Sequence, residues 1–354
     1  MNNNNNGFSR RKFLASSAAL AAVSMAPVNF ASANPSEQSD NPNSNFNGVH
    51  IGAITYSWRS MPGGLENIVK YCKECNISSI ELMSGDLEAY LGAPESPMMA
   101  IFAEIRKQQA AQAQNGDAPA QPQRRGRPEL SPEQQARMDK YNEEVREFRL
   151  NVDMKKVAAA KKLLDDANIK PHIVKFSPSG WSDPEIDYAF KVAKALGAKG
   201  VSEEISMEAA KKLAPFAEKY DMYAVFHQHM QFADVEGFSY DPYIPISPAI
   251  RFNFDSGHYF GSTGKNPVDM IKKYHDRIFS IHIKDKTGPN VDPPNQNQVW
   301  GQGQMPLEEL LLFIQKEKYP IFCDIELEYE VKPWSNAVKE VKTCVNFARQ
   351  ILVC

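Results

Sequence analysis

Short apolar runs alternate with longer amphipathic stretches along the chain from about residue 49 onwards. The runs have strand length and are rich in β-branched and aromatic residues, while the stretches repeat apolar residues at helical spacing. Two such stretches, DPEIDYAFKVAKALGA and SMEAAKKLAPFAEKY, open on an Asp or Ser that is typical of helix N-caps. The predicted strands cover residues 49–58, 78–84, 170–177, 200–206, 222–229, 250–258, 278–285 and 321–328.

Eight strands that alternate with helices predict a parallel (β/α)8 barrel, the TIM barrel. An open doubly wound sheet is disfavoured, because no glycine-rich phosphate turn follows the first strand. The chain has 354 residues, 42% of them hydrophobic, which is enough for a large core. We therefore expect one barrel domain over residues 47–354.

The alternation of strands and helices is interrupted after the second strand, from about residue 94 to 151. The middle of this segment, QAAQAQNGDAPAQPQRRGRPELSPEQQ, is rich in Gln, Ala, Pro and Arg. Such a composition predicts a flexible excursion between helices. We interpret its arginine cluster, residues 124–127, as part of a solvated loop rather than as a site for RNA or phosphate.

The beginning of the chain predicts export. SRRKFLASSAALAAVSMAPVNFASAN contains paired arginines, a short apolar region and a small-residue cleavage pattern, which together are typical of a twin-arginine signal peptide. We assign residues 1–33 to the signal and 34–46 to a polar linker, so the mature protein is expected in the periplasm. Because the apolar region is short, no membrane association is expected after cleavage.

The overall charge argues against polyanionic partners. A formal net charge of -3 and a pI near 6.2 provide no general attraction to nucleic acid or to anionic lipid. We therefore expect a small-molecule substrate and no nucleic acid. A homo-oligomer is compatible with the composition.

Ionisable residues gather at the ends of the later strands, which is where a TIM barrel carries its catalytic groups. Alternation along the strands sends one set of these side chains inward from four adjacent strands. A buried group of carboxylates and imidazoles needs a compensating cation. The inward set comprises His227, His229, Asp255, His282, Lys284, Glu326 and Glu328.

Mixed carboxylate and imidazole ligands without cysteine favour one divalent ion, Mn²⁺, Zn²⁺, Mg²⁺, Co²⁺ or Fe²⁺. We predict that Asp255 is a ligand of this ion. His258 follows it closely in the sequence and is expected to be either a further ligand or a partner of the ligands.

Four segments, DSGH, SIHIKDK, VWGQGQMPLEELLLFIQ and DIELEYE, resemble the xylose isomerase-like TIM-barrel superfamily. This superfamily contains sugar isomerases, epimerases and dehydratases, and an apurinic endonuclease branch. The resemblance extends from about residue 49 to the end of the chain. It implies Asp255, His282 and Glu326 as metal ligands, and His258 as the histidine of a D-x-x-H motif.

The fifth strand departs from the common pattern, because FHQH stands where many members have a glutamate. This H-x-H resembles a branch of inosose dehydratases and exported sugar isomerase-like proteins. Either His227 replaces the acid, or Glu204 reaches across from the fourth strand, and both are candidate ligands.

A metal bound to neighbouring oxygens of a sugar polarises a carbonyl and stabilises the enediolate that forms when an adjacent proton is removed. We expect Glu204, His229 or Glu328 to act as the base, with Lys284 or Lys175 as acid or cationic stabiliser. The residues assigned to substrate binding are Trp58, Glu81, Lys175, His258 and Trp300.

The expected function is therefore a metal-dependent sugar isomerase or epimerase, or a lyase. Export and the lack of a phosphate cradle favour a non-phosphorylated keto-sugar, and one specific version is 1,2-elimination from a 3-keto-glycoside. The alternatives are a carbohydrate-binding barrel without catalysis and, disfavoured by the net charge, a metal-dependent endonuclease-like hydrolase.

Overall fold

The computed structural model describes residues 41–114 and 130–353. The predicted signal peptide and the centre of the predicted insertion lie outside these residues. Within them, no helix is both long enough and apolar enough to span a bilayer.

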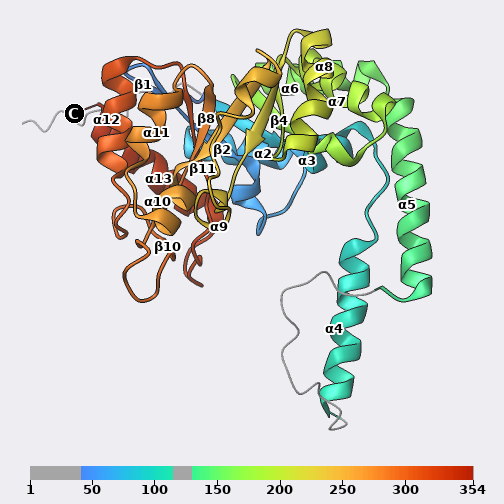
Figure 1. Cartoon of the computed structure of the whole chain (residues 1–354). Coiled ribbons are helices and arrows are strands. Elements are labelled where there is room, and N and C mark those ends of the chain that lie inside the picture. The colour runs from blue at the N-terminus through green and yellow to red at the C-terminus, as the bar shows by residue number, and fades with distance from the viewer. Residues whose placement is uncertain (1–40, 115–129, 354) are drawn as a thin grey trace, which may run out of the picture. The chain divides into compact units, whose positions relative to one another are not determined.

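Eight parallel strands close into a barrel, which confirms the predicted fold (Figure 1). Each strand pairs with the next one along the chain, and β11 pairs with both β8 and β2 to complete the ring. All eight lie within the predicted strand ranges, and each is shorter than its range. They are β2 (Val49–Ile54), β3 (Ser79–Met83), β4 (Lys170–Lys175), β5 (Gly200–Glu204), β6 (Tyr223–His227), β7 (Ile250–Asp255), β8 (Ile278–Ile283) and β11 (Phe322–Ile325).

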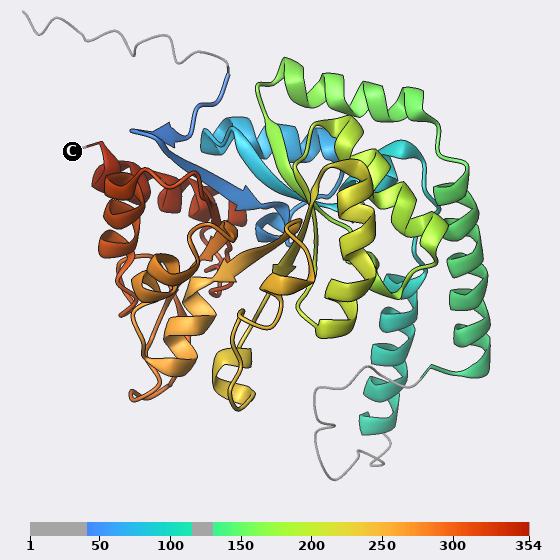
Figure 2. The same cartoon turned by 45° about the horizontal axis from the view of Figure 1, so that its top comes forward.

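Helices surround this barrel (Figure 2). Several open on side-chain caps that the sequence indicates, such as the capping box of Ser182 and Glu185 at α7. The barrel helices are α2 (Leu65–Cys75), α3 (Ser84–Leu91), α6 (Met154–Asp166), α7 (Asp183–Leu196), α8 (Met207–Tyr220), α10 (Ser256–Thr263), α11 (Pro267–Tyr274), α12 (Leu307–Glu317) and α13 (Ala337–Leu352). Short elements in the connections are η1 (Thr55–Trp58), η2 (Pro178–Gly180), α9 (Gln231–Asp234), η3 (Ile244–Ile246), β9 (Asp285–Lys286) and β10 (Asn297–Gln298).

The strand β7 shows how the barrel sorts its side chains. Phe252 and Phe254 belong to the apolar core that the strands share with the helices, while Asn253 and Asp255 alternate with them and are equally inaccessible to solvent. Burial on both faces is typical of parallel barrels. The strand therefore carries its polar residues into the interior of the barrel.

Two further helices, α4 (Met98–Gln114) and α5 (Pro132–Leu150), follow α3 in the segment predicted as an insertion. Glu104 of α4 accepts hydrogen bonds from Gln134 and Arg137 of α5. Near the end of α5, Arg149 donates to Glu88 of α3 at 2.9 Å and to Glu185 of α7 at 3.3 Å. These contacts join α5 to two helices of the barrel.

The segment predicted as a linker up to residue 46 includes the short strand β1 (Asn45–Phe46). This strand pairs antiparallel with β2, and the side chain of Phe46 is buried. Ser44 also contributes, because its backbone N–H donates to Ser78 Oγ at 3.1 Å.

A chain of buried polar contacts fills the barrel below the strand ends. Ser79 Oγ lies 2.9 Å from His172 Nδ1, and His172 Nε2 lies 2.8 Å from Asp324 Oδ2. The imidazole also stacks on Phe322 with 4.1 Å between ring centroids. Only glycine fits at position 52, since a Cβ there would lie 2.1 Å from Asp324 Oδ1. We call Ser79, His172 and Asp324 the lower relay.

Candidate metal centre and active site

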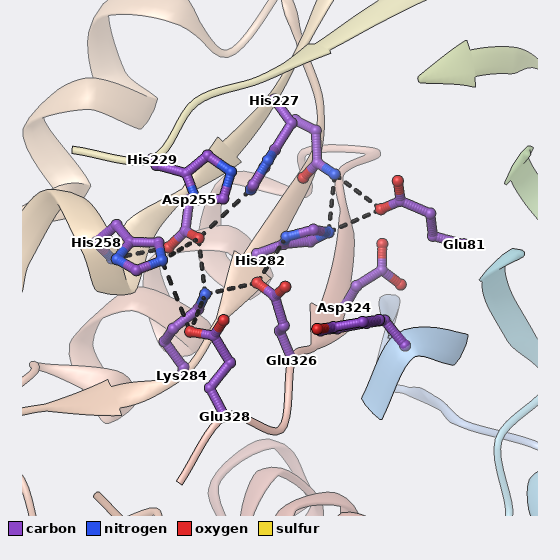
Figure 3. Close-up of polar contacts among 12 residues, drawn as sticks. Glu81, His227, His229, Asp255, His258, His282, Lys284, Asp324, Glu326 and Glu328 are labelled. Carbon is purple, nitrogen blue, oxygen red and sulfur yellow. Dashed lines mark hydrogen bonds and ion pairs between the residues drawn. The ribbon is translucent and has the colours of Figure 1, made fainter. Parts of the chain in front are cut away.

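Four buried side chains from four adjacent strands meet at the C-terminal end of the barrel (Figure 3). His227 and Asp255 end β6 and β7, His282 lies near the end of β8, and Glu326 follows β11. One ligand atom from each lies within 4.8 Å of the others. We call these four residues the buried cluster.

Three atoms of the buried cluster have no hydrogen bond within the described part of the chain. They are His227 Nε2, Asp255 Oδ2 and His282 Nδ1. Two of them have a charged neighbour at close range, because His282 Nδ1 lies 2.9 Å from Glu326 Oε2 and Asp255 Oδ2 lies 2.8 Å from Lys284 Nζ. Buried polar atoms are normally paired, because leaving one unpaired costs about 1–3 kcal/mol. Two imidazole nitrogens and two carboxylates suit a divalent ion such as Mn²⁺, Zn²⁺, Co²⁺ or Fe²⁺. The donor set therefore fits the predicted metal.

Glu81 on β3 holds His282 from behind the buried cluster. Its Oε2 lies 2.7 Å from His282 Nε2, and Ser202 and Asn253 donate to its two oxygens at 2.7 and 2.8 Å. Burial alone would raise the pKa of Glu81, but the charge and hydrogen bond of His282 bring it down to about 2. An anchored carboxylate of this kind fixes the ring so that Nδ1 faces the buried cluster.

Glu204 stands in a similar relation to His227. Its Oε2 lies 3.3 Å from His227 Nδ1, whereas His227 Nε2 faces Asp255 Oδ2 at 3.4 Å. The same carboxylate contacts His229 at 3.1 Å and Lys175 at 2.7 Å. Of the two residues considered for the fourth ligand, the structure brings His227 into the buried cluster. Glu204 belongs to a second, more exposed group with His227 and His229.

Lys284 reaches the buried cluster from β8. Its Nζ lies 2.8 Å from Asp255 Oδ2, 2.5 Å from Glu326 Oε2 and 2.9 Å from Glu328 Oε2. Burial would lower the pKa of this ammonium, but the three carboxylates raise it well above its ordinary value. The three carboxylates therefore favour the charged form of Lys284, which donates hydrogen bonds to them.

His258 and Lys286 form the outer edge of the site. The backbone N–H of His258 donates to Asp255 Oδ1 at 2.8 Å, and its ring Nε2 lies 3.6 Å from Glu328 Oε2. Lys286 Nζ is 3.4 Å from the other ring nitrogen. Burial lowers the pKa of His258 to about 4. Burial and the charge of Lys284 lower the pKa of Lys286 to about 8. Sequence reasoning missed Lys286, although the spacing from His282 and Lys284 could have indicated it.

The two tryptophans assigned to substrate binding are buried. Trp58 is 2% exposed and packs beside Tyr71, and Trp300 is 6% exposed and meets Phe347 edge-on. Neither ring offers an open face on which a sugar could stack. Lys175, also assigned to substrate binding, is occupied by its ion pair with Glu204.

Comparison with known proteins agrees with this architecture. In an alignment 147 residues long, which covers 36% of this chain and 49% of the relative, the chain is 26% identical to an inosose dehydratase from Clostridium botulinum. It thus spans about half the length of that curated relative.

Solved structures show the same fold over most of the chain. A xylose isomerase domain protein from Alicyclobacillus acidocaldarius superposes with a TM-score of 0.54 at 12% identity, covering 85% of this chain and 98% of that one. The structure of 3-keto-D-glucoside 4-epimerase YcjR from E. coli superposes with a TM-score of 0.51 at 10% identity, covering 85% of this chain and 99% of that one. The model of the family described as xylose isomerase-like TIM barrel matches residues 138–349, and the chain belongs to this family.

Proposed function

We propose that the protein is a divalent-metal-dependent enzyme that removes a proton next to a carbonyl of a non-phosphorylated keto-sugar. The observation that carries this proposal is the convergence of ligand atoms from His227, Asp255, His282 and Glu326, which all lie within 4.8 Å of one another. The twin-arginine pattern supports a periplasmic location for this activity.

The four residues of the buried cluster would hold the ion, which when bound would polarise a carbonyl oxygen of the substrate. Lys284 adds a fixed positive charge beside the same carboxylates. In a site shielded from water, such a charge stabilises negative charge that develops on a substrate oxygen.

Two groups at the open side of the site could exchange the proton. Glu328 is partly exposed and contacts Lys284 and His258. His229 is exposed, and its hydrogen bond with Glu204 raises its pKa, which favours the protonated ring that a proton donor needs. We assign Glu328 as the proton acceptor and His229 as the proton donor.

The specific reaction we favour is 1,2-elimination from a 3-keto-glycoside. The base takes the C2 proton, the C2–H electrons form a C1=C2 double bond, and the C1–O bond breaks to release the aglycone as an alcohol after protonation. The products are a 2-hydroxy-3-keto-glycal and the alcohol, so atoms and charge balance. A relative named for dehydration and a shared fold with a 3-keto-glucoside epimerase support this choice.

The first test is metal content. Purified protein should contain about one divalent ion per chain, and Asp255→Ala, His282→Ala and Glu326→Ala should each lower that content, because a lost ligand leaves an incomplete coordination sphere. Elemental analysis of the three variants measures this. Undiminished metal in all three would remove the basis of the proposal.

The second test is the reaction. Wild-type protein loaded with metal should release aglycone from a 3-keto-glucoside, or exchange its C2 proton in D₂O, and a chelator should stop both. Turnover of an unoxidised glycoside that survives chelation would instead indicate a hydrolase with two carboxylates. A barrel that only binds carbohydrate would show neither reaction.

A further inference from the structure

A pocket of about 320 Å³ lies at the C-terminal ends of the first two barrel strands. It opens between η1 after β2 and the start of α3 after β3. None of the chemistry assigned above uses it. Its walls include Tyr56, Trp58, Met61, Met83, Gly85 and Asp86.

Hydrogen bonds tie η1 and the residue after it, which form one side of this pocket, to the backbone on either side of Glu326. Ser57 Oγ donates to the carbonyl of Ile325 at 3.0 Å, and Arg59 donates to the carbonyl of Leu327 at 2.7 Å. These two carbonyls flank Glu326 in the sequence. The wall of the pocket is thus attached to the segment that carries one of the candidate metal ligands.

The lining is mostly apolar and adaptable. The methionines Met61 and Met83 supply soft thioethers that accept aromatic rings well. Tyr56 is 42% exposed, and the guanidinium of Arg59 lies 4.5 Å from the centre of its ring. The single carboxylate, Asp86, accepts a hydrogen bond from the backbone of Gly64 at 2.7 Å. One cation and one anion leave the pocket without net charge, which suits an uncharged group.

One polar atom in the wall lacks a partner. Trp58 Nε1 is buried and has no hydrogen-bond acceptor within the part of the chain that the structure describes. An indole N–H that is buried is usually paired, because an orphaned donor costs free energy. A ligand that brings an acceptor oxygen to this wall would satisfy it after a small movement of the ring.

We propose that this pocket is the subsite for the aglycone, and that the substrate is a glycoside whose aglycone is an uncharged aromatic ring with an acceptor oxygen. The inference rests on the proposed function, in which the sugar lies at the buried cluster. A second sugar ring fits the pocket less well, because its hydroxyl groups would meet thioether and aromatic walls with few polar partners.

The structure offers a substitution that fills the pocket without disturbing the fold. A Cβ on Gly85 would have open space around it, and the residue is the second of α3, where leucine is a better helix former than glycine. Gly85→Leu should lower kcat/KM for a 4-nitrophenyl 3-keto-glucoside about tenfold or more, while the methyl 3-keto-glucoside changes little. Metal content should stay at the wild-type level.

Gly180→Leu is the matched control. Gly180 also has open space for a Cβ, but it lies in η2 and forms no part of the pocket wall. This variant should leave the ratio of the two kcat/KM values unchanged. Equal losses for both substrates in Gly85→Leu, or no loss for either, would overturn the subsite.

A binding measurement separates the subsite from the reaction. In metal-loaded protein, the indole N–H resonance that Trp58→Phe removes should shift on titration with unoxidised 4-nitrophenyl glucoside and stay in place with methyl glucoside. The same resonance should stay in place in Gly85→Leu with either compound. If wild-type protein binds the aryl glucoside in this way but turns over no keto-glycoside, the proposed function fails and the subsite stands. An unmoved resonance at saturating aryl glucoside overturns the subsite.

Discussion

Each of the two histidines in the buried cluster has a carboxylate behind it. Glu81 contacts the Nε2 of His282, and Glu204 contacts the Nδ1 of His227, so opposite ring nitrogens face the centre in the two residues. A carboxylate in this position holds the proton on its own side of the ring and leaves the other nitrogen free to bind a metal. The orientation of both imidazoles is thus set by residues that do not belong to the cluster.

This arrangement predicts the effect of Glu81→Gln. The amide keeps the shape of the carboxylate but loses its charge, so metal affinity should fall by about 10- to 100-fold. Competition with a chelator of known affinity measures the change. Glu203→Gln is a suitable control, since Glu203 is also buried on the barrel but accepts hydrogen bonds from the backbone of Ser179 and Glu204. Equal affinities for Glu81→Gln and wild type would show that Glu81 does not orient the ligand.

Lys286 gives a prediction for stability. Its pKa of about 8 lies below that of an ordinary lysine, so the unfolded chain binds the proton more tightly than the folded one. The folded state therefore loses stability as the pH falls from about 10.5 to about 8, by at most about 3 kcal/mol, and the loss remains at lower pH.

Lys286→Met removes this loss. In chelated protein the variant should be more stable than wild type at pH 7, and the difference should shrink as the pH rises towards 10. Urea unfolding at several pH values measures it. A difference that does not vary with pH would mean that the charge of Lys286 is not the cause.

Much of the site could be predicted from the sequence at this scale. Alternation by two residues along the last strands indicates His282, Lys284, Glu326 and Glu328 as one inward set. It cannot show which ring nitrogen faces the centre, because that depends on partners from distant strands. Glu81 is the clearest case: it lies 201 residues before His282, and only closure of the barrel makes them neighbours.

At the scale of elements, Arg149 joins α5 to the barrel through polar contacts, beside the edge-on contact of Phe148 with Tyr188 of α7. Arg149 forms ion pairs with Glu88 and Glu185, and its guanidinium lies 3.5 Å from the centre of the Trp181 ring. The two glutamates are themselves largely buried. Removing the arginine would leave them without a compensating cation.

Arg149→Met should therefore destabilise the protein by about 3 kcal/mol, although methionine retains part of the packing. Arg137→Met is the control, because its ion pair with Glu104 is more exposed and is worth about 1 kcal/mol or less. Urea denaturation compares the two variants. Equal stabilities would show that the contacts of Arg149 do not anchor the helix.

The strands and most barrel helices could be predicted because their apolar residues recur with a clear period. The helices α4 and α5 could not be bounded in the same way. In α5 only Gln134 and Val145 are buried, so its sequence carries almost no apolar stripe. Contacts between polar side chains define this part of the fold, and a pattern of hydrophobic residues does not report them.

At the scale of the whole molecule, the buried cluster joins four neighbouring strands, β6, β7, β8 and β11. Without a cation, its carboxylates depend on Lys284 and on the histidines for compensation. An ion that binds only the folded barrel stabilises it according to its affinity, by about 2.7 kcal/mol at a concentration one hundred times the Kd.

We therefore expect the thermal midpoint to rise with added metal and to fall with chelator, and the response should be lost in Asp255→Ala. Calorimetric scans at several metal concentrations measure this. Ser79→Ala is the control, because Ser79 belongs to the lower relay and not to the buried cluster. This variant should change the thermal midpoint through the lost contact with His172, but its midpoint should still rise with metal. A thermal midpoint that changes with neither metal nor chelator would argue against a metal site in the folded protein.

The lower relay also has a kinetic consequence. Asp324, His172 and Ser79 are almost inaccessible to solvent, and the close approach of Asp324 to Gly52 leaves no space between neighbouring strands there. The lower relay therefore closes the barrel below the buried cluster. We therefore expect an ion and a sugar substrate to enter and leave at the C-terminal end of the barrel, so that a bound sugar would cover the route by which the ion leaves. Release of the metal should then be slowest while substrate is bound. The ion would bind before the substrate and leave after it.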